Sequence, residues 1–295
     1  MGTLVGVNPV LGMDNVVVSL KPLHSLVSNV MHGAGQPHLL VHGAASPHIF
    51  SLKPSSAKLL RKAKVIFWIG EILEAALIKP IKTLGIQANL VTLSKLDGLK
   101  LLKARNSGLL DNQSHENHNH AHSHSEIDGH LWLDPDNARI FLDVISSTLA
   151  RLDVVHADTY RANAAQAKKA IAALTHELDA ALQPIRGRPF IVFHDAYQYF
   201  EHRFNVDASG SVALGDASSP GPARIAAIRQ KVQTLGAHCV FSEPQFRSKI
   251  ITTVIEGTTA RSATLDPLGA TLKPGPELYS QLLRNLGDNL LTCLR

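Results

Sequence analysis

Histidine occurs in two different settings between residues 115 and 135. A polar run carries five histidines that are separated mostly by single small or polar residues, namely His115, His118, His120, His122 and His124. The run has no apolar period that could pack it on a core, so we expect a mobile loop over residues 112–125. Neutral imidazole is a common metal ligand, so such a loop predicts several weak, interchangeable sites for zinc, copper or nickel. A solvated insert that binds nothing is the alternative.

The second setting belongs to His130, which stands where the expected loop ends. The apolar residues Leu131, Trp132 and Leu133 follow it, and Asp134 and Pro135 are good residues for the cap and first position of a helix. Apolar residues then recur at helical spacing, so His130 is predicted to be held rigidly. A single histidine of this kind is more often structural than a ligand, and a metal site needs partners from elsewhere in the chain.

Those partners are predicted at the ends of apolar, strand-like runs. His48 lies just beyond His38–Val41, His194 and Asp195 follow Phe190–Phe193, Glu243 follows Cys239–Phe241, and Asp266 follows Ala263–Leu265. Ligands of open α/β sheets bind beyond the carboxyl ends of strands, so these side chains are expected to face one cleft.

Three imidazoles and one carboxylate form a set that suits tetrahedral zinc. We predict His48, His130, His194 and Asp266 as the ligands, and the three imidazoles make manganese the less favoured ion. Glu243 competes with Asp266 for the carboxylate position. We favour Glu243 and Asp195 as residues that orient the ligands through hydrogen bonds.

The elements predicted to position these residues are those of an α/β protein. Strand-like runs at 16–20, 38–41, 65–69 and 89–93 alternate with helical segments, and a second series occupies 190–193, 206–214, 239–241 and 263–265. Between the two series, apolar residues recur every three or four positions from His156 to Gln183, which predicts one helix of about 40 Å. We therefore expect two βα domains with mainly parallel sheets, joined by one long rigid helix, with the metal site in the interdomain cleft. The expected division is 14–146, 147–187 and 188–295.

Composition excludes several classes of function. The chain has 295 residues, 45% of them apolar, and no apolar run approaches the roughly 20 residues of a membrane span. The basic residues behind the net charge of +5 are scattered, so no nucleic-acid partner is expected. Cys239 and Cys293 form no CxxC pair, which disfavours a thiolate zinc site and leaves a single disulfide possible. Residues 1–12 could be the remnant of a trimmed signal peptide or an artificial start.

Several motifs together resemble the zinc-binding solute-binding proteins of bacterial ABC-type zinc importers, the ZnuA-like family. The motifs, in chain order, are Ser19-Leu20-Lys21-Pro22, Ala45-Ser46-Pro47-His48, Ser51-Leu52-Lys53-Pro54-Ser55, His130-Leu131-Trp132-Leu133, Phe193-His194-Asp195-Ala196-Tyr197, Ser242-Glu243-Pro244-Gln245-Phe246 and Thr264-Leu265-Asp266-Pro267-Leu268-Gly269. They cover nearly the whole chain from Val16, and an internal histidine-rich loop is typical of the zinc members.

The resemblance implies metal ligation by His48, His130 and His194, with Asp266 or water completing the shell. It also implies a Cys239–Cys293 disulfide, a periplasmic location, and delivery to an inner-membrane ABC permease with its ATPase. Manganese-binding relatives carry glutamate where this chain has His194, which favours zinc. Some zinc members have a glutamate at the position of Pro47, so that extra ligand is absent here.

Zinc capture and delivery by a monomer is thus the main hypothesis, and a zinc hydrolase that uses the same three histidines is the leading alternative. The sequence contains no HExxH, GxSxG or P-loop motif, so we expect no enzyme activity. A surface adhesin is a third possibility, and it predicts saturable binding to host matrix without zinc.

Overall fold

The computed structural model describes residues 12–49, 51–105, 127–213, 220–246 and 249–295. The predicted weak metal sites at His115, His118, His120, His122 and His124 lie outside the described residues, as do residues 1–11 of the ambiguous N-terminal stretch.

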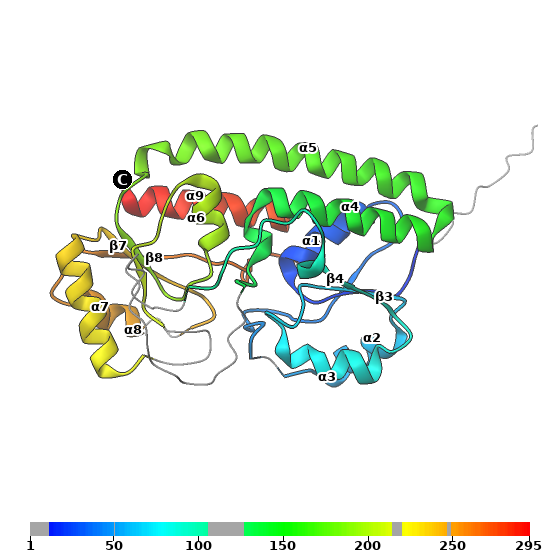
Figure 1. Cartoon of the computed structure of the whole chain (residues 1–295), viewed down its shortest axis with the longest axis horizontal. Helices are drawn as coiled ribbons and strands as arrows, with labels where there is room; N and C mark the ends of the chain where they lie inside the picture. The colour runs from blue at the N-terminus through cyan, green and yellow to red at the C-terminus, as the bar shows by residue number, and fades with distance from the viewer. Residues whose placement is uncertain (1–11, 50, 106–126, 214–219, 247–248) are drawn as a thin grey trace, which may run out of the picture.

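The N-terminal half is built on a parallel sheet with the strand order β2-β1-β3-β4. Its strands are β1 (Val16–Val18), β2 (His38–Leu39), β3 (Val65–Trp68) and β4 (Asn89–Thr92). Its helices are α1 (Lys21–Val30), α2 (Pro54–Lys62), α3 (Ala75–Leu84) and α4 (Pro135–Leu152), with short 3-10 turns η1 (Leu93–Lys95) and η2 (Leu131–Leu133). Strands β1 and β3 are fully buried because helices cover both faces of the sheet (Figure 1).

The C-terminal half repeats this plan with the parallel order β6-β5-β7-β8. Its strands are β5 (Phe190–Val192), β6 (Gly210–Ser211), β7 (Cys239–Ser242) and β8 (Arg261–Thr264), and its helices are α6 (Gln198–Phe204), α7 (Pro222–Leu235), α8 (Lys249–Ile255) and α9 (Leu278–Leu294). The strand expected over 206–214 is much shorter than predicted, because only Gly210 and Ser211 pair with β5.

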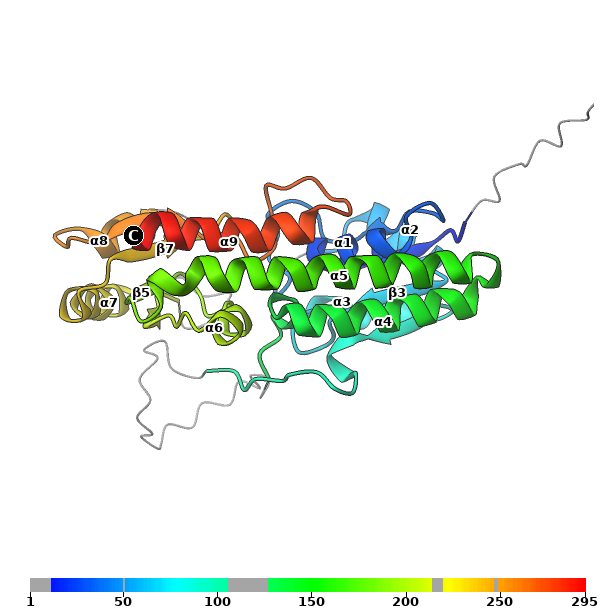
Figure 2. The same ribbon diagram turned by 90° about the horizontal axis from the view of Figure 1, so that it is seen from above.

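One long helix, α5 (Ala157–Leu182), runs over both halves (Figures 1 and 2). It follows the turn η3 (Val154–His156) and ends in η4 (Gln183–Ile185). Its 26 residues span about 39 Å at 1.5 Å per residue, as the sequence predicts. Figure 2 shows α4 and α9 lying beside it, and the buried side chains of all three helices belong to one apolar core.

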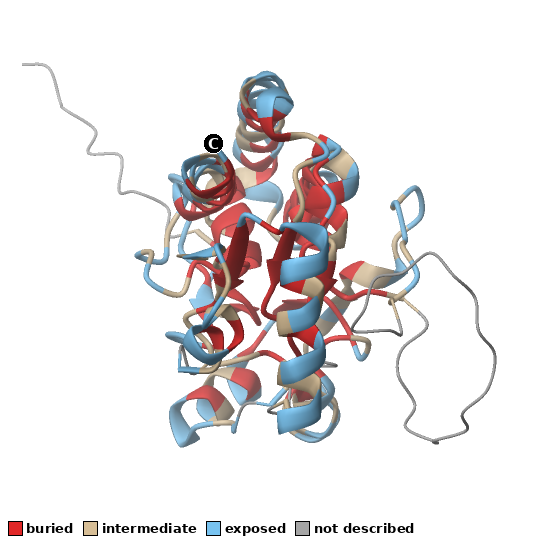
Figure 3. Cartoon of the chain, turned by 90° about the vertical axis from the view of Figure 1, so that its left-hand side faces the viewer, coloured by how far each residue is buried: buried red, intermediate tan, exposed pale blue. Residues whose placement is uncertain are grey.

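The predicted segment boundaries divide elements that pack together in the structure. Residue 146 lies inside α4, and α9 from the end of the chain packs on α1 near its beginning. The buried core is continuous from the first sheet to the second. Figure 3 shows buried residues in the strands and on the sides of the helices that face them. A smaller apolar cluster lies between the second sheet and α7 and α8. The division at 146 and 187 stays a prediction.

A disulfide joins Cys239 at the start of β7 to Cys293 near the end of α9. Their Cα atoms are 6.1 Å apart and 54 residues separate them in sequence. This pairing confirms the implication of the family resemblance. Within the described residues, no helix is both long enough and apolar enough to cross a membrane.

Candidate metal centre

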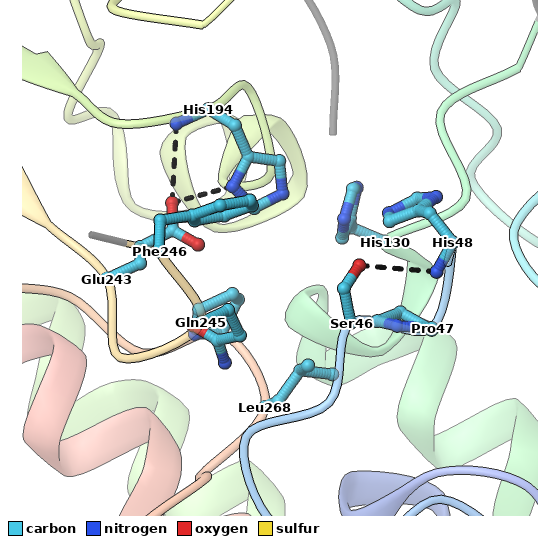
Figure 4. A pocket seen from close by; sticks show the side chains of 10 residues that line it. Ser46, Pro47, His48, His130, His194, Glu243, Gln245, Phe246 and Leu268 are labelled. Atoms are coloured by element: carbon cyan, nitrogen blue, oxygen red, sulfur yellow. Dashed lines mark hydrogen bonds and ion pairs between the residues drawn. The ribbon is translucent and has the colours of Figure 1, made fainter. Parts of the chain in front are cut away.

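Three histidines from three separate segments converge between the two halves of the molecule (Figure 4). His48 lies in the loop after β2, His130 directly precedes η2, and His194 lies two residues beyond the last residue of β5. Each offers a ring nitrogen, and these nitrogens lie within 4.8 Å of one another. The ring centroids are 5.5 Å apart for His48 and His130, 5.4 Å for His130 and His194, and 6.4 Å for His48 and His194.

The position of His130 follows from its local sequence. Leu131, Trp132 and Leu133 are completely buried, and the Asp134 carboxylate accepts a hydrogen bond from Asp136 N at the start of α4. Trp132 also donates from Nε1 to Pro267 O at 2.8 Å, which connects this segment to the C-terminal half. The side chain of His130 is therefore held before any ion binds.

Asp128 orients the imidazole of His130. Its Oδ1 lies 2.7 Å from His130 Nδ1 and also accepts a hydrogen bond from His130 N at 2.9 Å. Because a carboxylate accepts, Nδ1 carries the proton and Nε2 is left as the ligand atom. Sequence reasoning missed Asp128, although its spacing two residues before a candidate ligand was an available signal.

Glu243 has the same relation to His194. Its Oε1 lies 2.7 Å from His194 Nδ1 and 3.3 Å from His194 N, and both side chains are buried. The sequence predicts that Glu243 orients a ligand, and this role stays a prediction. A buried ring with its proton fixed on Nδ1 loses little rotational freedom when Nε2 binds an ion.

The structure gives the other predicted orienting residue, Asp195, a different partner. Both oxygens of its carboxylate accept from the guanidinium of Arg105, with Arg105 Nε 2.7 Å from Asp195 Oδ2. Arg105 precedes Asp195 by 90 residues, so no local pattern could have indicated this pair.

Asp266 lies outside the group formed by the three histidines among the described residues. Its Oδ1 accepts from Leu268 N and from Gln245 Nε2, both at 3.1 Å, and its Oδ2 accepts from Ala270 N at 2.6 Å. These bonds shape the loop after β8, and they direct the carboxylate toward that loop. The structure thus brings together three of the four predicted ligands.

The wall of the pocket is largely apolar. Besides the three histidines it is lined by Ser46, Pro47, Glu243, Gln245, Phe246, Pro267 and Leu268 (Figure 4). Phe246 stacks on Phe193 with a centroid distance of 4.4 Å and lies edge-on to His194 at 5.4 Å. His130 and His194 are each 5% exposed, whereas His48 is partly exposed. Three neutral nitrogen donors in such a pocket suit a divalent cation of borderline softness.

Comparison with known proteins gives the family of the chain. A family profile described as "ZnuA: Zinc-uptake complex component A periplasmic" matches residues 16–293. The high-affinity zinc uptake system protein ZnuA of Brucella abortus is 48% identical over 306 residues, which cover 95% of this chain and 92% of the relative. The corresponding protein of Paracoccus denitrificans is 38% identical, with 96% and 92% covered.

Solved structures share the fold across nearly the whole chain. A crystal structure of ZnuA superposes with a TM-score of 0.80 at 23% identity, covering 95% of this chain and 98% of that one. The family match and the near full-length relatives show that this chain belongs to the ZnuA family, the periplasmic component A of zinc-uptake complexes.

Proposed function

We propose that this protein captures zinc in the periplasm through His48, His130 and His194 and delivers it to the permease of an ABC-type importer. The observation that carries the proposal is the convergence of the three ring nitrogens in a chain of this family. Members of the family are transport components and not enzymes, so the zinc hydrolase is set aside. The bound ion is the cargo of the protein.

The distances fit zinc after a small contraction of the site. Zinc–nitrogen bonds of about 2.0–2.1 Å place two ligand nitrogens of a tetrahedral site about 3.3 Å apart. The three nitrogens already lie within 4.8 Å of one another. Shifts of about 1 Å per side chain would complete the shell, and the partly exposed His48 is the residue with most freedom to move.

A fourth ligand must come from water or from a carboxylate. Asp266 is the predicted protein candidate, but it lies outside the group of the three histidines and three hydrogen bonds hold its carboxylate, so it would have to move before it could bind the ion. Water needs no such rearrangement, and we therefore propose water in the fourth position.

The donor set favours zinc over manganese. Three imidazoles suit zinc, whereas manganese prefers a site richer in carboxylate. A manganese-bound solute-binding protein, FpvC of Pseudomonas aeruginosa, has a TM-score of 0.78 at 17% identity, so the fold by itself does not select the ion. Selectivity must come from the side chains. The carboxylate of Glu243 contacts His194 Nδ1, on the side away from the other two histidines (Figure 4).

Elemental analysis of the purified protein and chelator competition with zinc and manganese test the proposal. We expect one tight zinc site that His130→Ala removes, and weaker binding of manganese. The matched control is His176→Ala, which changes an exposed histidine on α5 and should leave the tight site intact. Equal zinc affinity of the two variants would refute the assignment. The permease partner requires a separate test, transfer of zinc to membranes that contain the transporter, and the expected monomer is checked by light scattering.

A further inference from the structure

An ion-paired cluster joins the two halves of the molecule beside the metal centre. Arg105, from the N-terminal half, contacts Asp195 and Glu201 of the C-terminal half. We call these three residues the Arg105 cluster. Arg105 Nε and Nη2 donate to the two oxygens of Asp195, and Nη1 and Nη2 donate to the two oxygens of Glu201 at 2.9 and 3.2 Å. One guanidinium thus serves four carboxylate oxygens, in the forked geometry that only arginine provides.

The cluster is largely shielded from water. The side chain of Glu201 is 3% exposed, that of Asp195 19% and that of Arg105 24%. Burial raises the pKa of Glu201 to about 7, and the positive charge of Arg105 acts in the opposite direction. A buried and a partly buried carboxylate without a cation would be costly, so loss of Arg105 should disturb both of their segments.

A tyrosine continues the contact between the halves. Tyr199 of α6 is completely buried, and its hydroxyl accepts from Leu102 N and donates to Asp128 O, both at 3.0 Å. Lys103 and Ile127 form an antiparallel bridge, so the two segments that contact α6 also contact each other. One of these segments contains Asp128, which orients His130, and α6 begins four residues after His194.

The geometry points to Arg105 as a positioning residue that fixes His194 relative to His130 and thereby sets how fast the bound ion leaves. This inference rests on the proposed zinc-binding function. Asp195 is the next residue after His194, so a guanidinium that holds Asp195 also holds the backbone of the ligand. Zinc–nitrogen bonds tolerate displacements of only a few tenths of an ångström. A small rotation of one half against the other would therefore weaken the bond to His194.

Zinc release from the full-length chain tests the role of Arg105. The zinc-loaded protein is mixed with an excess of a chromogenic chelator and the release rate is followed by stopped flow. We expect Arg105→Gln to release zinc about tenfold faster than wild type or more, the size typical of residues that support metal ligands. Arg105→Lys should be intermediate, because it keeps the charge and loses the fork.

Arg203→Gln is the matched control. Arg203 also joins the halves, through Asp136 at 3.6 Å, but Asp136 is 58% exposed and neither residue adjoins a histidine of the site. The Arg203→Gln protein should release zinc at the wild-type rate. The visible absorption of cobalt-loaded protein adds a readout of ligand geometry. We expect altered bands in Arg105→Gln and unchanged bands in Arg203→Gln.

Two results would overturn the inference, namely wild-type release from Arg105→Gln or equal acceleration in both glutamine variants. If Arg105→Gln does not fold, Arg105→Lys takes its place in the test. In that case a wild-type release rate and wild-type cobalt spectra of Arg105→Lys overturn the inference. Failure of the proposed function looks different. In that case the wild type itself holds no zinc that depends on His130.

Discussion

The carboxylate behind His130 should contribute measurably to zinc affinity even though it does not reach the ion. Asp128 is 6% exposed, and its Oδ1 accepts from both Nδ1 and N of His130 at 2.7 and 2.9 Å. Hydrogen bonds to a charged group contribute about 1.5–3 kcal/mol each. The Nδ1 contact also fixes the proton that leaves Nε2 free, so Asp128→Ala should weaken zinc binding by about 10- to 100-fold.

Asp128→Asn separates charge from geometry, because its amide oxygen can still accept both hydrogen bonds. We expect it to weaken binding by about tenfold or less, since only the charge is lost. Asp143→Asn is the control, because Asp143 is 58% exposed and pairs with Lys168 far from the site. Dissociation constants are measured by chelator competition. If Asp128→Ala binds zinc as wild type does while His130→Ala loses the tight site, the orienting role of Asp128 is wrong.

Three further predictions concern the loop, the ion and a buried acid. Deleting Asn112–Ser125 should leave one tight zinc site, because His130 is held by its own local structure, and only weaker sites should disappear from a titration. Zinc at a thousandfold excess over Kd should stabilise the fold by about 4 kcal/mol and raise Tm, and the effect should shrink in acid, because protons compete with zinc for imidazole. An unchanged Tm at neutral pH contradicts a tight site. Burial raises the pKa of Glu74 from 4.5 to about 7, so its neutral form stabilises the fold fully below pH 4.5 and this contribution is lost as the pH rises through about 7. This contribution to the free energy of unfolding is on the order of 3 kcal/mol between about pH 4 and about pH 8, and Glu74→Gln should remove it in urea unfolding. If the free energy of unfolding depends on pH in the same way in the variant and in the wild type, the prediction is wrong.

Local patterns predicted the elements and failed for contacts between them. The strand starts at Val16, Val65 and Phe190 follow from short apolar runs, and the helix start at Pro135 follows from its cap. The expected strand over 206–214 shrank to two residues, because apolar content alone does not show how many residues reach a neighbouring strand. Periodicity records which face of an element is buried, and the partner that covers this face lies elsewhere in the sequence.

The same distinction holds in the metal centre. His130 was a candidate because its support is adjacent in sequence, and His48 and His194 were candidates because each follows the carboxyl end of a strand, in two separate sheets. The partners of Asp195 and Asp266 were not identifiable. Arg105 reaches Asp195 from 90 residues away, and Asp266 accepts from backbone groups of a loop whose course depends on tertiary contacts. One of these contacts comes from buried Lys21, whose Nζ donates to three carbonyl oxygens, those of Gly269, Ala270 and Leu272.

The placement of charge around the site suits an ion that must be both captured and released. At the proposed site, three neutral imidazoles would leave the two positive charges of zinc uncompensated, and a buried charge without compensation is costly. Asp128 and Glu243 place negative charge beside Nδ1 of His130 and His194, across each ring from the nitrogen that would bind zinc. A carboxylate bonded directly to zinc would attract it more strongly, because Coulomb attraction falls with distance. Pro47 supplies no such group on the side of His48. In the proposed function, the orienting carboxylates would keep the three histidines ready for zinc without binding it directly, so the ion could still leave for the permease.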